Sequence, residues 1–351
     1  EHSGQAMTVA AACAAPGTLL GLWQLDLGCA DELVERGAEV TEDEVRRLRA
    51  AVRPESTAVI CYTSGTTGTA KGCVISHGNL AAECDTLIAG WGHLLAPRDA
   101  YREQIDVVNE AGAQVILMAS RALVQVARSR ADYLYVYEKL LAGVDRPVIL
   151  HWLGTMFDPA LHGYWGSADI DTATETFRTL IENNRSKIDG VKVSLLDAAH
   201  EVALRRALPA GVRLYTGDDF NYPELIIGDA QGHSDALLGI FAAIYPAAST
   251  ALQELDNGNA ARASQILDAT QELGRHIFAA PTYYYKTGIA FLSWLNGKQA
   301  GFSMVAGLST GRSVPHLAEL LRLADKAGLL SDPELAAHRM RIYLELNGLG
   351  S

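Results

Sequence analysis

Residues 187–198 read KIDGVKVSLLDA, an apolar run interrupted by a single lysine. The alternation of a β-strand places Lys192 and Ser194 on one face of this run and its valines on the other. A lysine in the middle of a buried parallel strand loses hydration, which disfavours the charged form and lowers its pKa. A neutral amine attacks carbonyl carbon and forms a Schiff base, so the run contains a candidate nucleophile. The alternative is a lysine at a strand end that faces solvent or pairs with Asp197.

Similar apolar runs recur along the chain, and helical periodicity separates the later ones, as over 100–111 and 171–183. An alternation of strand and helix is typical of βα units, whose parallel strands are buried on both faces. The predicted strands are 18–25, 57–63, 86–94, 115–119, 147–153, 191–196, 212–217 and 236–244.

The alternation stops after residue 244, where only helical patterns follow. They cover 247–255, 260–273, 287–295, 315–327 and 333–346. A proline and a charge pair lie in the segment 95–100, which we take as the joint between an N-terminal part and the βα units. The predicted domains are therefore 1–97, 98–246 (barrel strands four to eight) and a helical extension, 247–351.

Composition excludes several classes of protein. The 351 residues include 29 basic and 41 acidic side chains, a net charge of −12, which disfavours binding to the phosphates of a nucleic acid. No apolar run reaches the ~20 residues that a membrane-spanning helix needs, so no membrane partner is expected. The five cysteines all lie within the first 84 residues and match no zinc-binding spacing. We expect reduced thiols in a cytoplasmic protein with no bound metal.

A second motif, TAVICYTSGTTGTAKG, covers residues 57–72. An apolar strand leads into a loop of glycine and hydroxyl side chains and then a lysine, while 76–82 has the pattern of a helix start. Such a loop offers backbone N–H groups, hydroxyls and one cation to a phosphate. A plain turn rich in glycine and threonine is the alternative. The candidate phosphate-binding residues are Thr63, Ser64, Gly65, Thr66, Thr67, Gly68 and Lys71.

Residues 20–97 around this motif resemble a long-chain acyl-CoA synthetase of the adenylate-forming enzymes. The resemblance implies that the loop contacts ATP phosphates, with Mg²⁺, if this segment is functional. Ala70 departs from the proline that is usual in that family. The family's adenine-binding segment, ribose-binding aspartate and C-terminal domain with a catalytic lysine have no counterpart after residue 100.

Residues 101–348 resemble an uncharacterised family related to dihydrodipicolinate synthase and N-acetylneuraminate lyase. The similar strings, in order, are AGAQVILMASRAL from Ala111, RPVILHWLG from Arg146, DGVKVSLLDA from Asp189, GVRLYTGDD from Gly211, SDALLGIFAAIYP from Ser234 and APTYYYKTGIAFLSWLNG from Ala280. The resemblance implies a (β/α)8 TIM barrel of the aldolase type, with atypical N-terminal strands. It places Lys192 at the Schiff-base position on the sixth strand, without a cofactor.

The same resemblance suggests the neighbours of Lys192. Gly217, Asp218 and Asp219 would follow the seventh strand at the mouth of the barrel, where barrel active sites lie. Asp218 is expected to support catalysis, and Gly217, Asp219 and Ser194 to contact the substrate. Adjacent carboxylates point to opposite faces of a strand, which disfavours a shared metal.

His151 and Arg121 are two further candidate site residues, and the chain lacks one catalytic residue that is usual in that superfamily. Its catalytic tyrosine at the end of the fourth strand is replaced here by the run from Met118 to Arg121. His151 on the fifth strand is a candidate proton carrier or a satisfied core residue. Arg121 is expected to bind a substrate carboxylate or to form a surface ion pair. Tyr283, Tyr284 and Tyr285 are expected to pack rather than react.

The N-terminal third admits two interpretations. In the first, a ligase fragment is joined to the last five βα units of a barrel. In the second, the three early apolar runs complete the barrel, with Gly65–Gly68 as its carboxylate-binding loop and residues 87–92 as part of its third strand. An incomplete barrel exposes parallel edges, which favours a homo-oligomer.

The resulting function hypothesis is a Schiff-base-forming carbon–carbon lyase or synthase that acts on a small 2-oxo acid such as pyruvate. The alternatives are an ATP-dependent long-chain acyl-CoA ligase fragment and an inactive fusion product.

Overall fold

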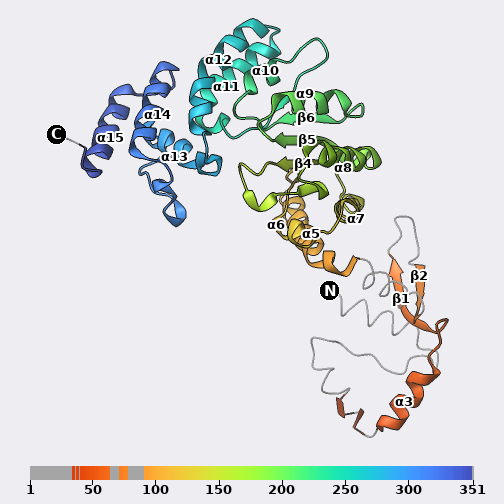
Figure 1. The fold of residues 1–351 in the computed structure, drawn as a ribbon. Helices are drawn as coiled ribbons and strands as arrows, with labels where there is room; N and C mark the ends of the chain where they lie inside the picture. The colour runs from red at the N-terminus through yellow and green to blue at the C-terminus, as the bar shows by residue number, and fades with distance from the viewer. Residues whose placement is uncertain (1–33, 36, 39, 64–70, 78–90, 350–351) are drawn as a thin grey trace. The chain divides into compact units, whose positions relative to one another are not determined.

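The structure is a computed structural model that describes residues 34, 35, 37, 38, 40–63, 71–77 and 91–349. The chain divides into two compact units, Glu1–Gly90 and Trp91–Ser351 (Figure 1). Each unit is described separately below. Among the described residues, no helix is both long enough and apolar enough to cross a membrane.

The described part of the first unit contains a helix and a hairpin. Helix α3 (Glu42–Ala51) begins at Thr41, whose side chain accepts a hydrogen bond from the Glu44 N–H group, as is usual for an N-cap. Strands β1 (Thr57–Thr63) and β2 (Lys71–Ser76) pair antiparallel. The run 57–63 is therefore a strand as predicted, but it pairs in a hairpin and not in the parallel sheet. Ser76 ends β2 and His77 is helical, and the rest of the helix start predicted over 76–82 lies outside the described residues.

The second unit is built on a five-stranded sheet in which β3, β4, β5, β6 and β7 are neighbours in chain order and all parallel. Helices connect successive strands, as in consecutive units of a (β/α)8 barrel. The strands are β3 (Ile116–Met118), β4 (Val148–Leu153), β5 (Ile188–Ser194), β6 (Arg213–Thr216) and β7 (Asp235–Ala236). The α-helices among them are α5 (Leu95–Glu110), α6 (Arg121–Val126), α7 (Arg130–Ala142), α8 (Ile170–Asn183), α9 (Ala198–Ala207) and α10 (Tyr222–Ile227). Short 3-10 helices are η3 (Gly92–Leu94), η4 (Pro159–Leu161), η5 (Tyr164–Gly166) and η6 (Arg185–Lys187).

The C-terminal helices form a group of their own beside the sheet (Figure 1). They are α11 (Phe241–Asp256), α12 (Ala260–Ile277), α13 (Tyr285–Leu295), α14 (Val314–Lys326) and α15 (Pro333–Leu346), with η7 (Thr282–Tyr284) and η8 (Val305–Thr310) between them. All five helical patterns predicted after residue 244 are confirmed. Their apolar sides pack on one another around buried residues such as Phe278, Phe291 and Leu320.

Three details of the sequence interpretation differ from the structure. Within the predicted strand 86–94, residues 92–94 form the 3-10 helix η3, while 86–90 lie outside the described residues. The run 236–244 is mostly not a strand, because β7 ends at Ala236 and α11 begins at Phe241. The segment 95–100, taken as a joint, lies in the first turns of α5. Pro97 fits there because the first turn of a helix needs no N–H donor from that residue.

The two faces of the five-stranded sheet differ in their covering. Leu117, Leu150, Trp152, Val191 and Leu214 lie on one face and pack with the helices in a continuous core. The other face carries Lys192 and its neighbours. At β3 this second face is open, since Ile116 is 44% and Met118 49% exposed. The uncovered face therefore corresponds to the interior of a barrel.

Candidate active site

Strand β5 carries Lys192 near its middle, on the face of the sheet that corresponds to the interior of a barrel. The register aligns Met118, His151, Lys192 and Tyr215 in one row across β3, β4, β5 and β6. Side chains in such a row project to the same face. The structure thus brings together His151 and Lys192, which lie 41 positions apart in the sequence.

Burial lowers the pKa of Lys192, and the nearby carboxylate of Asp219 acts in the opposite direction. Asp197, the alternative partner considered from the sequence, instead accepts the His200 N–H at 3.0 Å and begins helix α9. The lysine is neither at a strand end nor paired with Asp197. Burial therefore makes the neutral amine, which is the nucleophilic form, more accessible than in an exposed lysine.

His151 is 6% exposed, and its Nε2 lies 3.0 Å from the Ser194 hydroxyl. Burial, and then the charge of Lys192, lower the pKa of His151 to about 3. The imidazole is therefore neutral near pH 7. A neutral ring holds Ser194 in place without adding a positive charge next to the lysine.

Gly217 follows β6 and lies next to the Lys192 side chain. A Cβ atom at this position would lie 2.0 Å from Ser194 Oγ, 2.8 Å from the Val193 carbonyl oxygen and 3.0 Å from Lys192 Cε. The Gly217 N–H donates to that same carbonyl oxygen at 2.7 Å. The end of β6 thus approaches β5 closely, and only glycine fits between.

We expect Gly217→Ala to destabilise the protein by about 1–3 kcal/mol, because the strand backbone leaves the added methyl group no room. The displaced Lys192 side chain should also react more slowly with carbonyl compounds. Urea unfolding and borohydride trapping measure the two effects. Gly301→Ala is the control, since no atom lies within 4 Å of its added Cβ. Equal stability of the two variants would contradict the close approach.

The two aspartates after β6 have different partners. Asp218 accepts hydrogen bonds from the backbone N–H groups of Phe220 and Asn221 at 2.8 and 2.9 Å and from the Asn221 side chain at 2.9 Å. Asp219 accepts the Ile240 N–H at 2.6 Å, and burial raises its pKa to about 7. Asp218 therefore shapes the loop, whereas Asp219 is the carboxylate that interacts electrostatically with Lys192. In this arrangement the catalytic role expected for Asp218 fits Asp219 better.

Arg121 lies at the start of α6, just after β3. Its Nε donates to Asp158 at 2.5 Å, and its side chain is 67% exposed. No contact joins it to Lys192 among the described residues. The arginine forms the ion pair that the sequence left open as its alternative role.

The end of β3, where the superfamily's tyrosine is absent, is surrounded by tyrosines from other elements. Tyr137 and Tyr164 hydroxyls lie 2.9 Å apart, and that of Tyr101 lies 3.3 Å from the first and 3.4 Å from the second. Tyr101 donates to the Met118 carbonyl oxygen, and the Ser120 N–H donates to Tyr164 at 3.1 Å. These buried hydroxyls satisfy the backbone at the strand end.

Of the predicted phosphate loop, the structure describes only the two ends. Thr63 ends β1 and Lys71 begins β2, and the two residues pair across the hairpin. Ser64, Gly65, Thr66, Thr67 and Gly68 lie outside the described residues.

One buried carboxyl group was not anticipated. Glu201 on α9 is 1% exposed, and its Oε2 accepts the Thr216 hydroxyl at 3.0 Å. Thr216 Oγ1 also accepts the Asp218 N–H at 3.1 Å, so Glu201 supports the loop that carries Asp219. Burial raises the pKa of Glu201 to about 7, although the hydroxyls of Ser234 and Thr216 lower it. It lies between the predicted strands 191–196 and 212–217, where the sequence gave no sign of this role.

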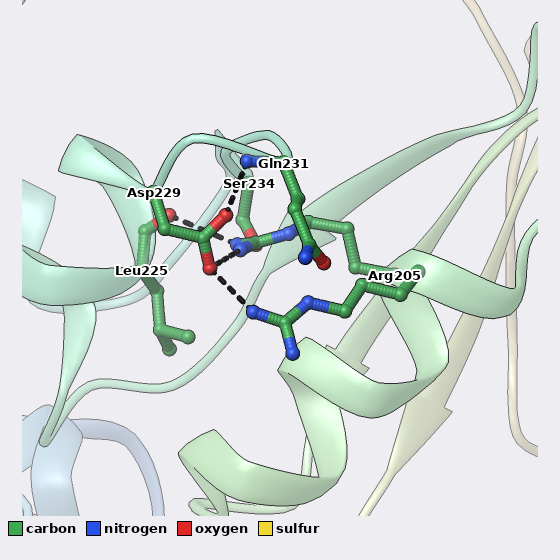
Figure 2. A network of polar contacts seen from close by, with 6 residues as sticks. Arg205, Leu225, Asp229, Gln231 and Ser234 are labelled. Carbon is green, nitrogen blue, oxygen red and sulfur yellow. Dashed lines mark hydrogen bonds and ion pairs between the residues drawn. The ribbon is translucent and has the colours of Figure 1, made fainter.

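Behind β6, Arg205 joins α9 to the loop before β7 (Figure 2). Its guanidinium donates to Ser234 Oγ at 3.2 Å and pairs with Asp229 at 3.4 Å, while Arg206 pairs with the same carboxylate at 2.8 Å. The Gln231 N–H donates to the other oxygen of Asp229 at 2.8 Å. This network fixes Ser234 beside Glu201.

A cleft of about 370 Å³ opens where β4 and β5 end. It is lined by residues 152–156 at the end of β4 and after it, by Leu195 and Asp197 after β5, and by residues 161–164, 167, 168 and 170. Clefts at the C-terminal ends of barrel strands are where such folds bind small molecules.

A comparison with family models adds an identification. The model described as "Protein of unknown function (DUF993)" matches residues 23–349. The chain belongs to this family. The match to the DUF993 family includes both the sheet and the C-terminal helices.

Solved structures similar in fold to the DUF993 chain include dihydrodipicolinate synthases. A monomeric variant of that enzyme is 13% identical, with a TM-score of 0.50 over 66% of this chain and 71% of its own. A candidate dihydrodipicolinate synthetase from Pseudomonas aeruginosa is 16% identical, with a TM-score of 0.50 over 64% and 70% of the two chains. The predicted α/β fold of the aldolase TIM-barrel type is confirmed.

Part of the DUF993 chain is also similar to acyl-CoA ligases. Human long-chain-fatty-acid–CoA ligase 1 is 29% identical over 143 residues, which are 36% of this chain. The chain spans about a fifth of the length of that curated relative.

Proposed function

We propose that this protein is a class I, Schiff-base-forming carbon–carbon lyase or synthase that acts on a small 2-oxo acid. The observation that carries the proposal is the position of Lys192. It lies mid-strand on the face of the sheet that corresponds to the interior of a barrel, and burial lowers its pKa. An amine that is easily deprotonated at such a position is suited to attack a carbonyl group.

The reaction begins when Lys192 Nζ attacks the carbonyl carbon of the oxo acid. A C–N bond forms, and the carbinolamine then loses its oxygen as water to give a protonated imine. The imine nitrogen accepts the electron pair released when a neighbouring C–C bond breaks, or returns it when that bond forms. Both steps require proton transfer at a group that titrates near neutral pH.

Asp219 meets that requirement better than His151. Its pKa is raised to about 7, and its charge interacts with that of Lys192. The pKa of His151, about 3, keeps the ring neutral, so its role in the proposal is to position Ser194. Asp219 would hold or release the proton of the carbinolamine step.

The test is reductive trapping. The full chain is mixed with pyruvate and other small 2-oxo acids, borohydride is added, and intact and peptide masses are measured. We expect the mass of one reduced adduct on the peptide that contains Lys192. A protein that melts cooperatively and forms no adduct would rule out the proposal for the acids tested. A protein that neither melts cooperatively nor forms an adduct would favour an inactive fusion product.

The second candidate function is an ATP-dependent acyl-CoA ligase. It is supported by the similarity to the human ligase and by the hairpin that brings Thr63 opposite Lys71. ATP–pyrophosphate exchange that depends on a fatty acid and Mg²⁺ would support it. Absence of exchange, with trapping at Lys192, would leave the lyase as the activity of the chain.

A further inference from the structure

Three aromatic side chains meet over the mouth of the half-barrel. Phe157 follows β4, Phe278 ends α12, and Tyr285 begins α13. The rings of Phe278 and Tyr285 stack, with centroids 4.5 Å apart and planes inclined by 20°. The Phe157 ring lies edge-on to both, at 6.3 and 6.0 Å. We call these three residues the aromatic wall.

The aromatic wall joins the two sides of the mouth. Gly239 follows β7, and a Cβ there would lie 2.9 Å from Phe278 Cζ and 3.3 Å from Tyr285 Cε2. Phe157, on the opposite side, follows β4. Because β5 and β6 lie between β4 and β7 in the sheet, a contact between these two sides passes over the ends of β5 and β6. Those ends carry Ser194 and Gly217.

Asp219 links the aromatic wall to the lysine. Its carboxylate is held by the Ile240 N–H, next to Gly239. Burial lowers the pKa of Lys192, and the Asp219 charge opposes that change; burial and then the same charge raise the pKa of Tyr285. Ile240, whose N–H binds Asp219, directly follows Gly239, and Gly239 lies against the Phe278 and Tyr285 rings. The Tyr285 hydroxyl stays protonated and remains a donor near neutral pH.

The rings also keep surface available. Phe278 is fully buried, but Phe157 and Tyr285 are only partly buried against the C-terminal core. Two partly buried aromatic rings at the mouth of a site form a surface for a flat apolar group, through both area burial and ring stacking.

We propose that the aromatic wall binds an aromatic substituent on the oxo acid, which makes the substrate an aryl-substituted 2-oxo acid. The inference rests on the proposed Schiff-base function and narrows its substrate class. The carbonyl carbon lies at Lys192 Nζ, and the ring of the substrate stacks against Phe157 and Tyr285.

The experiment compares two probes, phenylpyruvate and pyruvate. For each acid, the concentration that gives half-maximal borohydride trapping on Lys192 is measured in the full chain. We expect a value at least tenfold lower for phenylpyruvate. In Phe157→Ala the ratio should fall below threefold, whereas Tyr285→Phe, which keeps the ring, should retain it. Tyr283→Ala is the control, since Tyr283 lies in the same segment and its ring contacts Tyr284 instead, with the planes inclined by 55°.

Three outcomes decide the matter. Equal half-maximal concentrations in the full chain, or a tenfold ratio that survives Phe157→Ala, would overturn the aromatic wall while leaving the lysine chemistry intact. No adduct with either acid would overturn the proposed function and this inference with it. If Phe157→Ala loses its cooperative melt, Phe157→Leu replaces it, and the ratio should then fall at least threefold.

Discussion

We expect Lys192→Met to abolish the adduct that borohydride traps. Methionine has nearly the length of lysine and no amine, so no C–N bond to the oxo acid can form. Any lyase turnover should fall at least about 10³-fold, because loss of a covalent nucleophile removes the whole imine pathway. Peptide masses after trapping, and turnover of the acid identified by trapping, provide the measurement.

Stability separates this effect from misfolding. Lys192 is desolvated, so an apolar side chain of similar size should keep or raise the melting temperature. Lys298→Met is the matched control, because Lys298 is exposed on the C-terminal extension. An adduct that persists in Lys192→Met, or disappears in Lys298→Met, would place the reactive amine elsewhere.

The second large effect is a pH dependence of stability that belongs to Glu201. Its pKa in the folded protein is raised from 4.5 to about 7. Between these values the folded protein keeps a proton that the unfolded chain has released. Stability from Glu201 is therefore complete below pH 4.5 and is lost as the pH rises through 7. At about 1.4 kcal/mol for each pH unit, the loss amounts to about 3 kcal/mol.

Glu201→Gln isolates this contribution. The amide stays neutral at every pH, so the variant should match the parent at pH 4.5 and exceed it by up to about 3 kcal/mol at pH 8. Urea unfolding of both proteins at the two pH values measures the difference. Glu175→Gln makes the same change on the exposed side of α8 and should produce no such difference.

Comparison with the variant is needed because other groups oppose Glu201. The pKa of His151 is lowered to about 3 and that of His316 to about 4. Below pH 6.5 these histidines are protonated in the unfolded chain but remain neutral in the folded protein. Their contribution to the free energy of unfolding therefore rises with pH up to that value. Both histidines are present in parent and variant, and their effect cancels. An unchanged difference from pH 4.5 to 8 would show that Glu201 is ionised in the fold.

Local patterns in the sequence were sufficient to predict the strand of the lysine. Strand alternation placed Lys192 and Ser194 on one face, and β5 confirms it. The helices 260–273 and 333–346 followed from periodicity and lie within α12 and α15. Periodicity of this kind indicates which face of a helix or strand is buried, and it can be read from a few consecutive residues.

Contacts between residues far apart in the sequence could not be predicted from local periodicity. Asp218 and Asp219 are neighbours with the same chemistry, and only the Ile240 N–H, 21 positions away, separates their roles. Arg121 finds Asp158 at 37 positions. The run 236–244 looked like a strand because its residues are apolar, but most of them serve the start of α11. Tyr285 was expected only to pack, and its place beside Gly239 depends on how the C-terminal helices sit against the sheet.

The stacking of Phe278 and Tyr285 above Gly239 has a consequence for how this chain can be divided or recombined. The C-terminal helices look like an appendage to a barrel, yet they supply one side of its mouth. A protein shortened at residue 246 would keep Lys192, Asp219 and Phe157 and lose two of the three rings. The C-terminal helices therefore belong to the proposed substrate site, and a chimera that carried a different set of helices should change the preference for phenylpyruvate over pyruvate.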